Sequence, residues 1–391
     1  MSKPIVIAGG GIGGLAAALR CASSDVAVQL FERAKAFSEV GAGIQIGPNV
    51  TRILKAWGLD SAVQSVAAFP DFLRVRQAQS GAQTGQLRLG LTAVARYGAP
   101  YATIHRADLH DLLLQAVHEQ ARAQLILNQD VTGYAQQTDG VSVQLANGEP
   151  MMAKALVGAD GLWSKVRAQL LGDGEPRFTG HLAYRAMLLQ SELPAALRTQ
   201  NVTVWMGPRL HVVQYPVRRG ELLNLVAIVH GPAPSDMTPW DHAANAAGLA
   251  HALGDICADL KALIEAAPEW RLWPLCDRVP LRGAHQQAQG AVALLGDAAH
   301  PMRPYMAQGA GMAIEDADTL GRCLALPGAD VPAKLAHFAQ LRWQRNARVQ
   351  QRAIRNGQIF HAQGLLRWGR DTSIRLMGEG LLDVPWLYGG P

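Results

Sequence analysis

The 391-residue sequence predicts an α/β protein with a Rossmann-like domain, an inserted antiparallel-sheet domain and a helical C-terminal region. Three observations predict this fold. A glycine-rich turn follows an apolar segment at the N-terminus, four extended segments follow one another between residues 181 and 229, and helical patterns dominate after residue 311. We expect residues 1–176 and 277–330 to form the first domain, 177–276 the sheet domain and 331–391 the helical region.

The first 32 residues have the pattern of a strand, a helix and a second strand. Residues 3–8 are apolar and predict a buried strand. Residues 13–23, rich in alanine and leucine, predict a helix, and residues 26–32 predict the second strand. The unit ends in an acidic residue, Glu32, at the distance from the glycines that a dinucleotide-binding unit requires.

The turn between the first strand and the helix contains Gly9, Gly11 and Gly14 in GxGxxG spacing. Glycines permit the tight turn and the close approach of the backbone to a pyrophosphate, and the helix N-terminus adds partial positive charge. The carboxylate of Glu32 can accept hydrogen bonds from ribose hydroxyls. A chance run of glycines would not explain the strand, the helix and the acidic residue together.

The remaining pattern defines the order of the other elements. In the first domain we expect a glycine-rich loop at 39–49 that opens a helix to residue 57, a helix within 102–120, strands at 125–127, 141–145 and 155–161, and a helix at 164–171. In the sheet domain we expect strands at 181–189, 202–206, 211–217 and 222–229 and a helix at 243–266 that covers one face. A strand at 291–295 returns to the first domain, and a helix follows at 312–324.

A second motif, Gly296-Asp297, follows the returning strand. A carboxylate offers up to four acceptor sites and suits the open ribityl chain of a flavin, which a nicotinamide dinucleotide lacks. Asp160-Gly161 ends another strand, and Gln308-Gly-Ala-Gly311 opens the helix whose N–H groups would face the flavin ring. Gly296-Asp297 alone would suit an ordinary turn, but the combination favours FAD over NAD.

Composition limits the partners. The net charge is +5, with 17% charged and 49% apolar residues. The densest basic segment places Arg342, Arg345, Arg348, Arg352 and Arg355 on one side of a predicted helix, which we interpret as a solvated or carboxylate-paired face. No nucleic-acid groove or membrane surface is therefore expected.

The cysteines and the N-terminus indicate the compartment. Cys21, Cys257, Cys276 and Cys323 form no CxxC pair, which is typical of structural thiols in a reducing compartment. A strand begins within five residues of the N-terminus, and no apolar run reaches the roughly 18 residues of a membrane span. We expect a cytoplasmic protein.

Taken together, the motifs resemble those of the single-component flavoprotein aromatic hydroxylases, the p-hydroxybenzoate hydroxylase class, over nearly the whole chain. The resemblance rests on Gly9–Gly14, Ala159–Arg167, Gly296–Pro301 and Gln308–Ala317. Within the class, Tyr101–His110, His211–Pro216, His300–Gly309 and the C-terminal segment are most similar to 3-hydroxybenzoate 6-hydroxylases, salicylate hydroxylases and 6-hydroxynicotinate 3-monooxygenases. The hydroxynicotinate enzymes carry histidine at the positions of Gln45 and Tyr305, and the 3-hydroxybenzoate enzymes carry glutamine at the position of Pro304.

The resemblance implies bound FAD, with NADH or NADPH as a transient co-substrate and no separate nicotinamide domain. For Arg33 and Arg106, surface ion pairs are the alternative to cofactor contact. The expected cofactor contacts are Gly9, Gly11, Gly13, Gly14, Glu32, Arg33, Gln45, Arg106, Val131, Asp160, Asp297, Gly309, Ala310 and Gly311.

The activity implied is hydroxylation of a phenolic aromatic carboxylate by O2, activated as a flavin C4a-hydroperoxide. Such a reaction needs a base that removes the phenolic proton. His211 and Tyr215 lie four positions apart on a predicted strand and so share a face, and an imidazole is suited to proton transfer near neutral pH. The alternative is that both are packed sheet residues.

The pocket is expected between the flavin and the sheet, lined by Gln45, Met302, Pro304, Tyr305 and Met306. Arg185 and Arg303 are candidate partners of the substrate carboxylate. Around His300, His105 and His110 no metal-ligand spacing is present, so no metal is expected.

Other functions are also compatible with the sequence. They are oxidative decarboxylation of a 6-hydroxynicotinate, another flavin chemistry (oxidase, reductase or halogenase), or a non-catalytic flavin sensor. A homodimer is also open.

Overall fold

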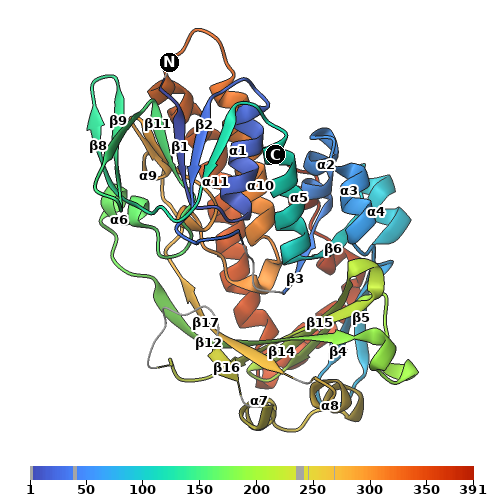
Figure 1. Cartoon of the computed structure of the whole chain (residues 1–391). Helices are drawn as coiled ribbons and strands as arrows, with labels where there is room; N and C mark the ends of the chain where they lie inside the picture. The colour runs from blue at the N-terminus through green and yellow to red at the C-terminus, as the bar shows by residue number, and fades with distance from the viewer. Residues whose placement is uncertain (1–2, 38–41, 235–241, 245, 268) are drawn as a thin grey trace.

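The computed structural model describes residues 3–37, 42–234, 242–244, 246–267 and 269–391. Two β-sheets lie at opposite ends of the molecule, with helices between and beside them (Figure 1). The order of elements confirms the predicted α/β fold with a helical C-terminus.

The first sheet is mainly parallel, with the strand order β18-β19-β11-β1-β2-β7. Its strands are β1 (Ile5–Ala8), β2 (Val28–Phe31), β7 (Ala123–Ile126), β11 (Ala155–Gly158), β18 (Ala288–Gln289) and β19 (Val292–Leu294). Only β18 runs antiparallel to its neighbour, β19. Because β1, β11 and β19 are adjacent and parallel, the segments that follow them meet at one edge of the sheet.

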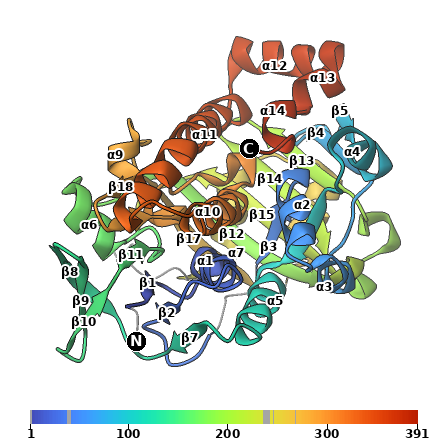
Figure 2. The same cartoon turned by 90° about the horizontal axis from the view of Figure 1, so that it is seen from above.

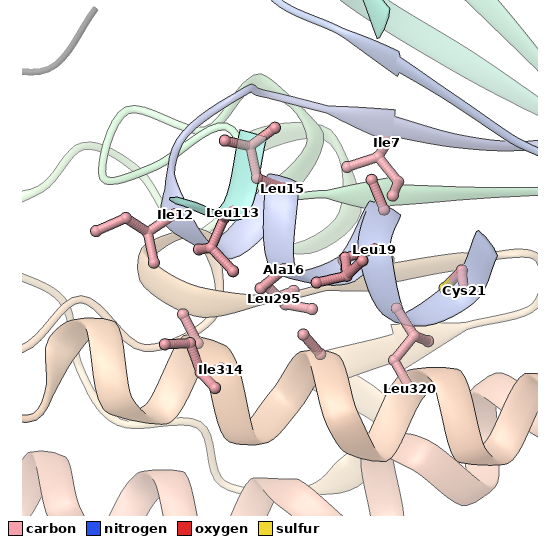
Figure 3. Close-up of a cluster of buried hydrophobic side chains, with 14 of the residues drawn as sticks. Ile7, Ile12, Leu15, Ala16, Leu19, Cys21, Leu113, Leu295, Ile314 and Leu320 are labelled. Carbon is pink, nitrogen blue, oxygen red and sulfur yellow. The ribbon is translucent and has the colours of Figure 1, made fainter. Parts of the chain in front are cut away.

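Helix α1 (Ile12–Ala22) packs between this sheet and helix α10 (Gly309–Leu324). Figure 3 shows Ala16 and Leu19 of α1 on the side that faces Ile314 and Leu320 of α10. A Cβ atom at Gly321 would lie 2.9 Å from the backbone oxygen of Arg20, so the two helices approach each other closely at this glycine. This contact ties the N-terminal dinucleotide unit to the segment that follows Asp297.

The second sheet has eight strands in the order β16-β17-β12-β15-β14-β13-β4-β5. Its strands are β4 (Phe72–Gln77), β5 (Gln83–Arg88), β12 (Arg177–Leu189), β13 (Val202–Gly207), β14 (Leu210–Val217), β15 (Leu222–His230), β16 (His242–Ala244) and β17 (Trp270–Asp277). The four successive strands expected from the sequence are β12 to β15. The sheet is not purely antiparallel, because β4 pairs with β13 in parallel.

Two strands of this sheet, β4 and β5, come from residues outside 177–276. Both strands carry arginines (Arg74, Arg76 and Arg88), and β5, which is an edge strand, has little of the apolar alternation that predicts a strand. We therefore propose that residues 72–88 join the sheet domain.

Helices α7 (Ala246–Leu253) and α8 (Ala258–Glu265) pack against one face of the large sheet, as their shared core with β12 and β15 shows. The prediction of a single helix over residues 243–266 was wrong. Gly254 adopts a φ of +60°, which ends α7, and residues 242–244 form strand β16 instead.

The C-terminal region is helical, as predicted. Helix α11 (Val331–Phe360) reaches from the first sheet to the second, and Asp330 caps its start by accepting a hydrogen bond from the Ala333 N–H at 2.9 Å. Beyond it, α12 (Gly364–Met377), α13 (Glu379–Leu382) and α14 (Pro385–Tyr388) lie beside β4 and β5 (Figure 2).

The other elements complete the first domain. They are β3 (Gly43–Ile46), α2 (Pro48–Ala56), α3 (Asp60–Val66), α4 (Gly90–Tyr97), β6 (Ala102–His105), α5 (Arg106–His118), β8 (Val131–Gln137), β9 (Gly140–Leu145), β10 (Pro150–Ala153), α6 (Lys165–Leu171) and α9 (Ala284–Gln287). Residues 38–41 of the expected glycine-rich loop lie outside the described residues. Within the described part of the chain, no helix has the length and apolar character needed to cross a bilayer.

Candidate active site

The N-terminal glycine turn packs directly against the end of β11. Gly9 has a φ of +102°, and a Cβ atom there would lie 2.5 Å from the carbonyl oxygen of Ala159. A Cβ atom at Gly14 would lie 1.9 Å from the carbonyl oxygen of Gly9. Only glycine fits both positions, and the turn therefore presents bare backbone beside the start of α1, as a pyrophosphate requires.

Glu32 is fixed beside this turn at the end of β2. Its carboxylate accepts hydrogen bonds from the backbone N–H of Gly10 at 2.7 Å and of Ala34 at 2.8 Å. Two of its four acceptor sites remain for ribose hydroxyls. Arg33 follows it and is exposed.

Asp297 lies in the 3-10 helix η4 (Gly296–Ala298), directly after β19. A Cβ atom at Gly309, the first residue of α10, would lie 3.9 Å from an Asp297 carboxylate oxygen, and one at Gly13 would lie 3.0 Å from Leu295. The two motifs that are far apart in the sequence therefore meet at one sheet edge, together with the N-terminal residues Gly309 to Gly311 of α10.

Asp297 is accessible to solvent, but its carboxylate lies deep enough among protein atoms to be partly desolvated. Desolvation by this surrounding protein raises its pKa, and Coulombic interaction with His300 and Arg106 opposes that rise. Arg106 is the first residue of α5, and its Coulombic effect on Asp297 shows that its charge lies near this edge. A carboxylate in such a place gains from hydrogen-bond donors such as ribityl hydroxyls.

Asp160 has a structural role in this conformation. Its carboxylate accepts hydrogen bonds from the Ser164 hydroxyl at 2.5 Å and the Lys165 N–H at 2.8 Å, which caps α6. The buried Arg167 of α6 donates to the carbonyl oxygens of Ala298 at 3.0 Å and Ala299 at 2.7 Å. The Asp160 segment is thereby tied to the Asp297 segment, and cofactor contact through Asp160 itself stays a prediction.

The other expected cofactor residues lie in different settings. Gly11 is the N-cap of α1. The Val131 side chain is buried in the core with Val143 and Leu156, which leaves only its backbone for cofactor contact. Gln45, on β3, accepts a hydrogen bond from the Tyr101 hydroxyl at 2.6 Å.

These donors and acceptors fit FAD. The glycine turn would hold the pyrophosphate, Glu32 the adenosine ribose and Asp297 the ribityl chain, with the N-terminus of α10 at the flavin ring. When bound, FAD supplies two-electron redox chemistry.

We expect Asp297→Asn to lower FAD affinity by roughly 10- to 100-fold, because a hydrogen bond to a charged group contributes about 1.5–3 kcal/mol. Titration of apoprotein with FAD, followed by the change in flavin fluorescence, measures this. The matched control is Asp255→Asn, an exposed carboxylate after α7. Wild-type affinity in both Asp297→Asn and Asp297→Ala would contradict the assignment.

A cavity of about 670 Å³ lies between the second sheet and the C-terminal half of α11. One wall is apolar and comes from the sheet, and the opposite wall includes the 3-10 helix η5 (Pro304–Met306). Of the predicted pocket residues, Gln45, Pro304, Tyr305 and Met306 line the cavity. Met302 does not, because it packs with Met312, Val349 and Leu387 instead.

His211 and Tyr215 share one face of β14, as expected, but differ in surroundings. His211 lines the cavity. Tyr215 lies outside the cavity lining and donates its hydroxyl hydrogen to the Gly43 carbonyl at 2.7 Å. Burial raises the pKa of Tyr215 well above its ordinary value. The place of His211 in the cavity wall supports it as a base, and a catalytic role for Tyr215 stays a prediction.

Three further histidines gather beside His211. His211 Nδ1 lies 2.8 Å from His361 Nε2, and His361 Nδ1 lies 2.9 Å from His230 Nε2. His181 Nδ1 lies 2.5 Å from the Tyr305 hydroxyl. No sequence pattern predicted this cluster, because its members lie on β12, β14, β15 and at the end of α11. Only the sheet register and the helix packing bring them together.

Burial lowers the pKa of His211 to about 3 and, together with Coulombic repulsion from His230, lowers that of His181 to about 4. These imidazoles are therefore neutral at pH 7. Ring nitrogens of His181, His230 and His361 all lie within 4.8 Å of one another, a spacing that would admit a metal ion where the sequence predicted none. Within this trio the contacts are those of neutral rings, because His230 and His361 share a hydrogen bond while His181 packs against both and pairs with the Tyr305 hydroxyl instead.

The arginines near the cavity differ from those predicted. Arg303 forms an ion pair with Asp277 at 2.7 Å. The guanidinium carbon of Arg185 lies 4.0 Å from the centroid of the Trp273 ring, and burial lowers the pKa of Arg185 to about 10. Neither Arg303 nor Arg185 lines the cavity. Arg352 and Arg355 do line it.

The basic row on α11 is carboxylate-paired at its start, one of the two environments expected. Arg342, which is 1% exposed, donates to Glu315 at 2.9 Å and to Asp316 at 2.7 Å. Arg345 also donates to Glu315, at 2.7 Å. His300 Nε2 lies 2.6 Å from Asp316, so His300 belongs to this network.

Comparison with known proteins agrees with this geometry. Residues 2–353 match the family model described as FAD binding domain. The chain is 36% identical over 388 residues to a 3-hydroxybenzoate 6-hydroxylase of Polaromonas naphthalenivorans, covering 99% of this chain and 96% of the relative. It is also 36% identical over 357 residues to a 6-hydroxynicotinate 3-monooxygenase of Bordetella bronchiseptica, covering 89% and 90%.

Among solved structures, a salicylate hydroxylase substrate complex matches with a TM-score of 0.81 and 27% identity, covering 99% of this chain and 97% of that one. The resemblance inferred from the motifs is thereby confirmed. The chain belongs to the family of the FAD binding domain and is an FAD-dependent aromatic monooxygenase.

Proposed function

We propose that this enzyme hydroxylates the ring of a phenolic aromatic carboxylate of the 3-hydroxybenzoate or salicylate type, with NADH or NADPH as electron donor and O2 as oxygen donor. The observation that carries the proposal is the position of His211. A neutral imidazole therefore lies in the wall of a largely apolar cavity that is also lined by Arg352, Arg355 and Arg370. The names of the relatives support the same substrate class.

His211 would act on the phenolic proton. Its Nδ1 is engaged with His361, so Nε2 is the nitrogen left to accept a proton from the substrate hydroxyl. Loss of that proton makes the ring electron-rich, as attack on an electrophilic oxygen requires. The apolar side chains of Val204, Met206 and Val213 line the same wall as His211 and would pack against the substrate ring and exclude water from it.

Arg352 and Arg355 would bind the substrate carboxylate. Both lie on the C-terminal half of α11 and line the cavity. Neither forms an ion pair with a carboxylate of the described residues. An arginine at this place offers the fork of donors that matches a carboxylate.

We expect Arg352→Met or Arg355→Met to raise the KM for the aromatic acid by roughly 10-fold, because a charge-assisted hydrogen bond contributes about 1.5–3 kcal/mol and solvent screening reduces it. The KM for the corresponding neutral amide should not change. Steady-state NADH oxidation measures both constants. Arg348→Met is the control, because Arg348 lies on the same helix but does not line the cavity. Its guanidinium carbon lies 3.9 Å from the centroid of the Trp386 ring instead. Equal losses for acid and amide in both cavity variants would contradict the assignment.

A panel of hydroxylated aromatic acids, each tested for stimulated NADH oxidation and for its product, tests the proposed function. We expect 3-hydroxybenzoate or salicylate to give a ring-hydroxylated product. Oxidative decarboxylation of 6-hydroxynicotinate is the second candidate, because the Bordetella bronchiseptica relative is as similar, at 36% identity, as the 3-hydroxybenzoate enzyme. NADH oxidation that no acid stimulates would overturn both.

We also propose a reducing compartment such as the cytoplasm, because the four cysteines are free thiols.

A homodimer is a further proposal. Helix α12 exposes several large apolar side chains, among them Leu365 at 87% and Leu376 at 82%, and these side chains could pack against a second copy of the chain. Light scattering after size-exclusion chromatography measures the oligomeric state.

A further inference from the structure

Three imidazoles form a continuous hydrogen-bonded line that starts at the cavity. His211 Nδ1 lies 2.8 Å from His361 Nε2, and His361 Nδ1 lies 2.9 Å from His230 Nε2. Both ring nitrogens of His361 are thus engaged, one toward the cavity side and one away from it. Each link is within normal hydrogen-bond distance.

The line runs from a buried end to a partly exposed end. His211 is 1% exposed and His361 7% exposed, whereas His230, the last residue of β15, is only half-buried. A neutral imidazole carries one donor and one acceptor. Three neutral imidazoles in a line can therefore all be hydrogen-bonded in one direction, with the free acceptor at the cavity and the free donor at the surface.

His211 cannot retain a proton that it accepts. Burial and Coulombic repulsion from His181 lower its pKa to about 3. The pKa of His361 is lowered still further, by burial and then by its histidine neighbours and Arg370. A proton placed on this side of the line is therefore unstable unless it moves on toward solvent.

We propose that His211, His361 and His230 form a proton relay that carries the phenolic proton of the substrate from the cavity to solvent. This inference rests on the proposed function. In the outward step the substrate O–H bond breaks and a bond to His211 Nε2 forms. The Nδ1 proton of His211 passes to His361 Nε2, the Nδ1 proton of His361 passes to His230 Nε2, and His230 releases its Nδ1 proton to water.

The step balances, because one proton enters the line, one leaves it and no electrons move. Each ring then carries its proton on Nε2. When the product phenolate takes a proton back from His211 Nε2, the same transfers run inward and restore the starting tautomers. The relay therefore serves both proton loss and proton return within one turnover.

Tyr305 and His181 hold the line in place. The Tyr305 hydroxyl lies 2.5 Å from His181 Nδ1, and the His181 ring packs 4.4 Å from the His230 ring and 5.0 Å from the His361 ring, measured between centroids. His181 and His230 are also cross-strand neighbours on β12 and β15. We assign both as positioning residues.

The relay is tested by proton release on binding. FAD-loaded, oxidised enzyme is mixed with 3-hydroxybenzoate in weakly buffered solution containing a pH indicator, and release is followed by stopped flow. The wild type should release one proton per site in a fast phase. We expect His361→Phe to slow this release by roughly 100-fold, the scale of general base catalysis, with unchanged affinity for 3-hydroxybenzoate. In His361→Ala, which leaves space at this buried position, added imidazole should restore the rate.

His230→Gln is the milder second variant, because it changes the half-buried end, and it should slow release by roughly 10-fold. His337→Gln, an exposed histidine on the same helix as His361, is the control and should behave as wild type. Bound flavin absorbance and the melting temperature establish that each variant is folded.

Wild-type release rates in folded His361→Phe and His230→Gln would overturn the relay. The relay would also be overturned if the purified wild type contained one metal ion per chain and His361→Phe contained none. The histidines His181, His230 and His361 would then form a metal site. A wild type that binds and hydroxylates 3-hydroxybenzoate without releasing a proton would also overturn the relay. If no acid of the panel is hydroxylated, the proposed function fails, and the relay fails with it.

Discussion

Replacing His211 by glutamine should lower the rate of product formation by roughly 10²- to 10³-fold while FAD stays bound. Glutamine preserves polarity but cannot accept the phenolic proton, so the ring would remain a weak nucleophile. NADH should still be consumed, and the oxygen that does not reach the ring should appear as hydrogen peroxide. The ratio of product to NADH consumed, measured by chromatography, therefore separates loss of the base from loss of the cofactor.

Val213→Ala is the matched control for this variant. Val213 lies on the same strand and the same face as His211 and also lines the cavity, but it has no proton to exchange. It should change product formation by less than roughly 10-fold, the scale on which a small change in an apolar pocket acts. A His211→Gln enzyme with wild-type coupling would remove His211 from the mechanism.

Arg342→Met should have the largest effect on stability, a loss of about 3–5 kcal/mol. Removing the guanidinium leaves Glu315 and Asp316 as buried carboxylates without their shared partner. The Asp316 carboxylate also accepts a hydrogen bond from the N–H of Gly296, at 3.2 Å, so the loss should extend to the Asp297 segment. Denaturant unfolding followed by intrinsic fluorescence measures the change.

The pH dependence of stability provides a second measurement on the same variant. Burial alone would raise the pKa of Asp316, but His300 and Arg342 hold it well below its ordinary value. A carboxylate with a depressed pKa stabilises the fold above its unfolded pKa of about 3.9, and this stabilisation is lost as the pH falls below that value. The loss should be smaller in Arg342→Met.

Arg348→Met serves as the control for Arg342→Met, because its cation–π contact with Trp386 contributes only about 1 kcal/mol at an exposed site. Equal unfolding free energies for Arg342→Met and the wild type would contradict the assigned importance of the buried network.

The sequence alone predicted the elements that local rules determine. The steric demand on Gly9 and Gly14, the acidic residue that ends β2 and the parallel order of β1, β11 and β19 all follow from short-range pattern and handedness. Those rules were sufficient to bring Asp297 to the glycine turn.

Features that depend on packing were not predictable. Met302 precedes the cavity-lining residues by only two positions, yet its side chain packs beside Val349, because the direction of a loop side chain depends on the helix that packs against it. His361 ends a long helix, and nothing in its local sequence indicates that it meets His211. The edge strand β5 was missed for the related reason that an edge strand needs little apolar alternation.

The central claim, that this enzyme transfers oxygen from O2 to a phenolic acid, is tested most directly by isotope labelling. FAD-loaded enzyme is supplied with NADH, the stimulating acid and ¹⁸O2, and the product is analysed by mass spectrometry. We predict a ring-hydroxylated product that carries one ¹⁸O atom. A product without ¹⁸O, or hydrogen peroxide as the sole fate of the labelled oxygen with every acid of the panel, would contradict it.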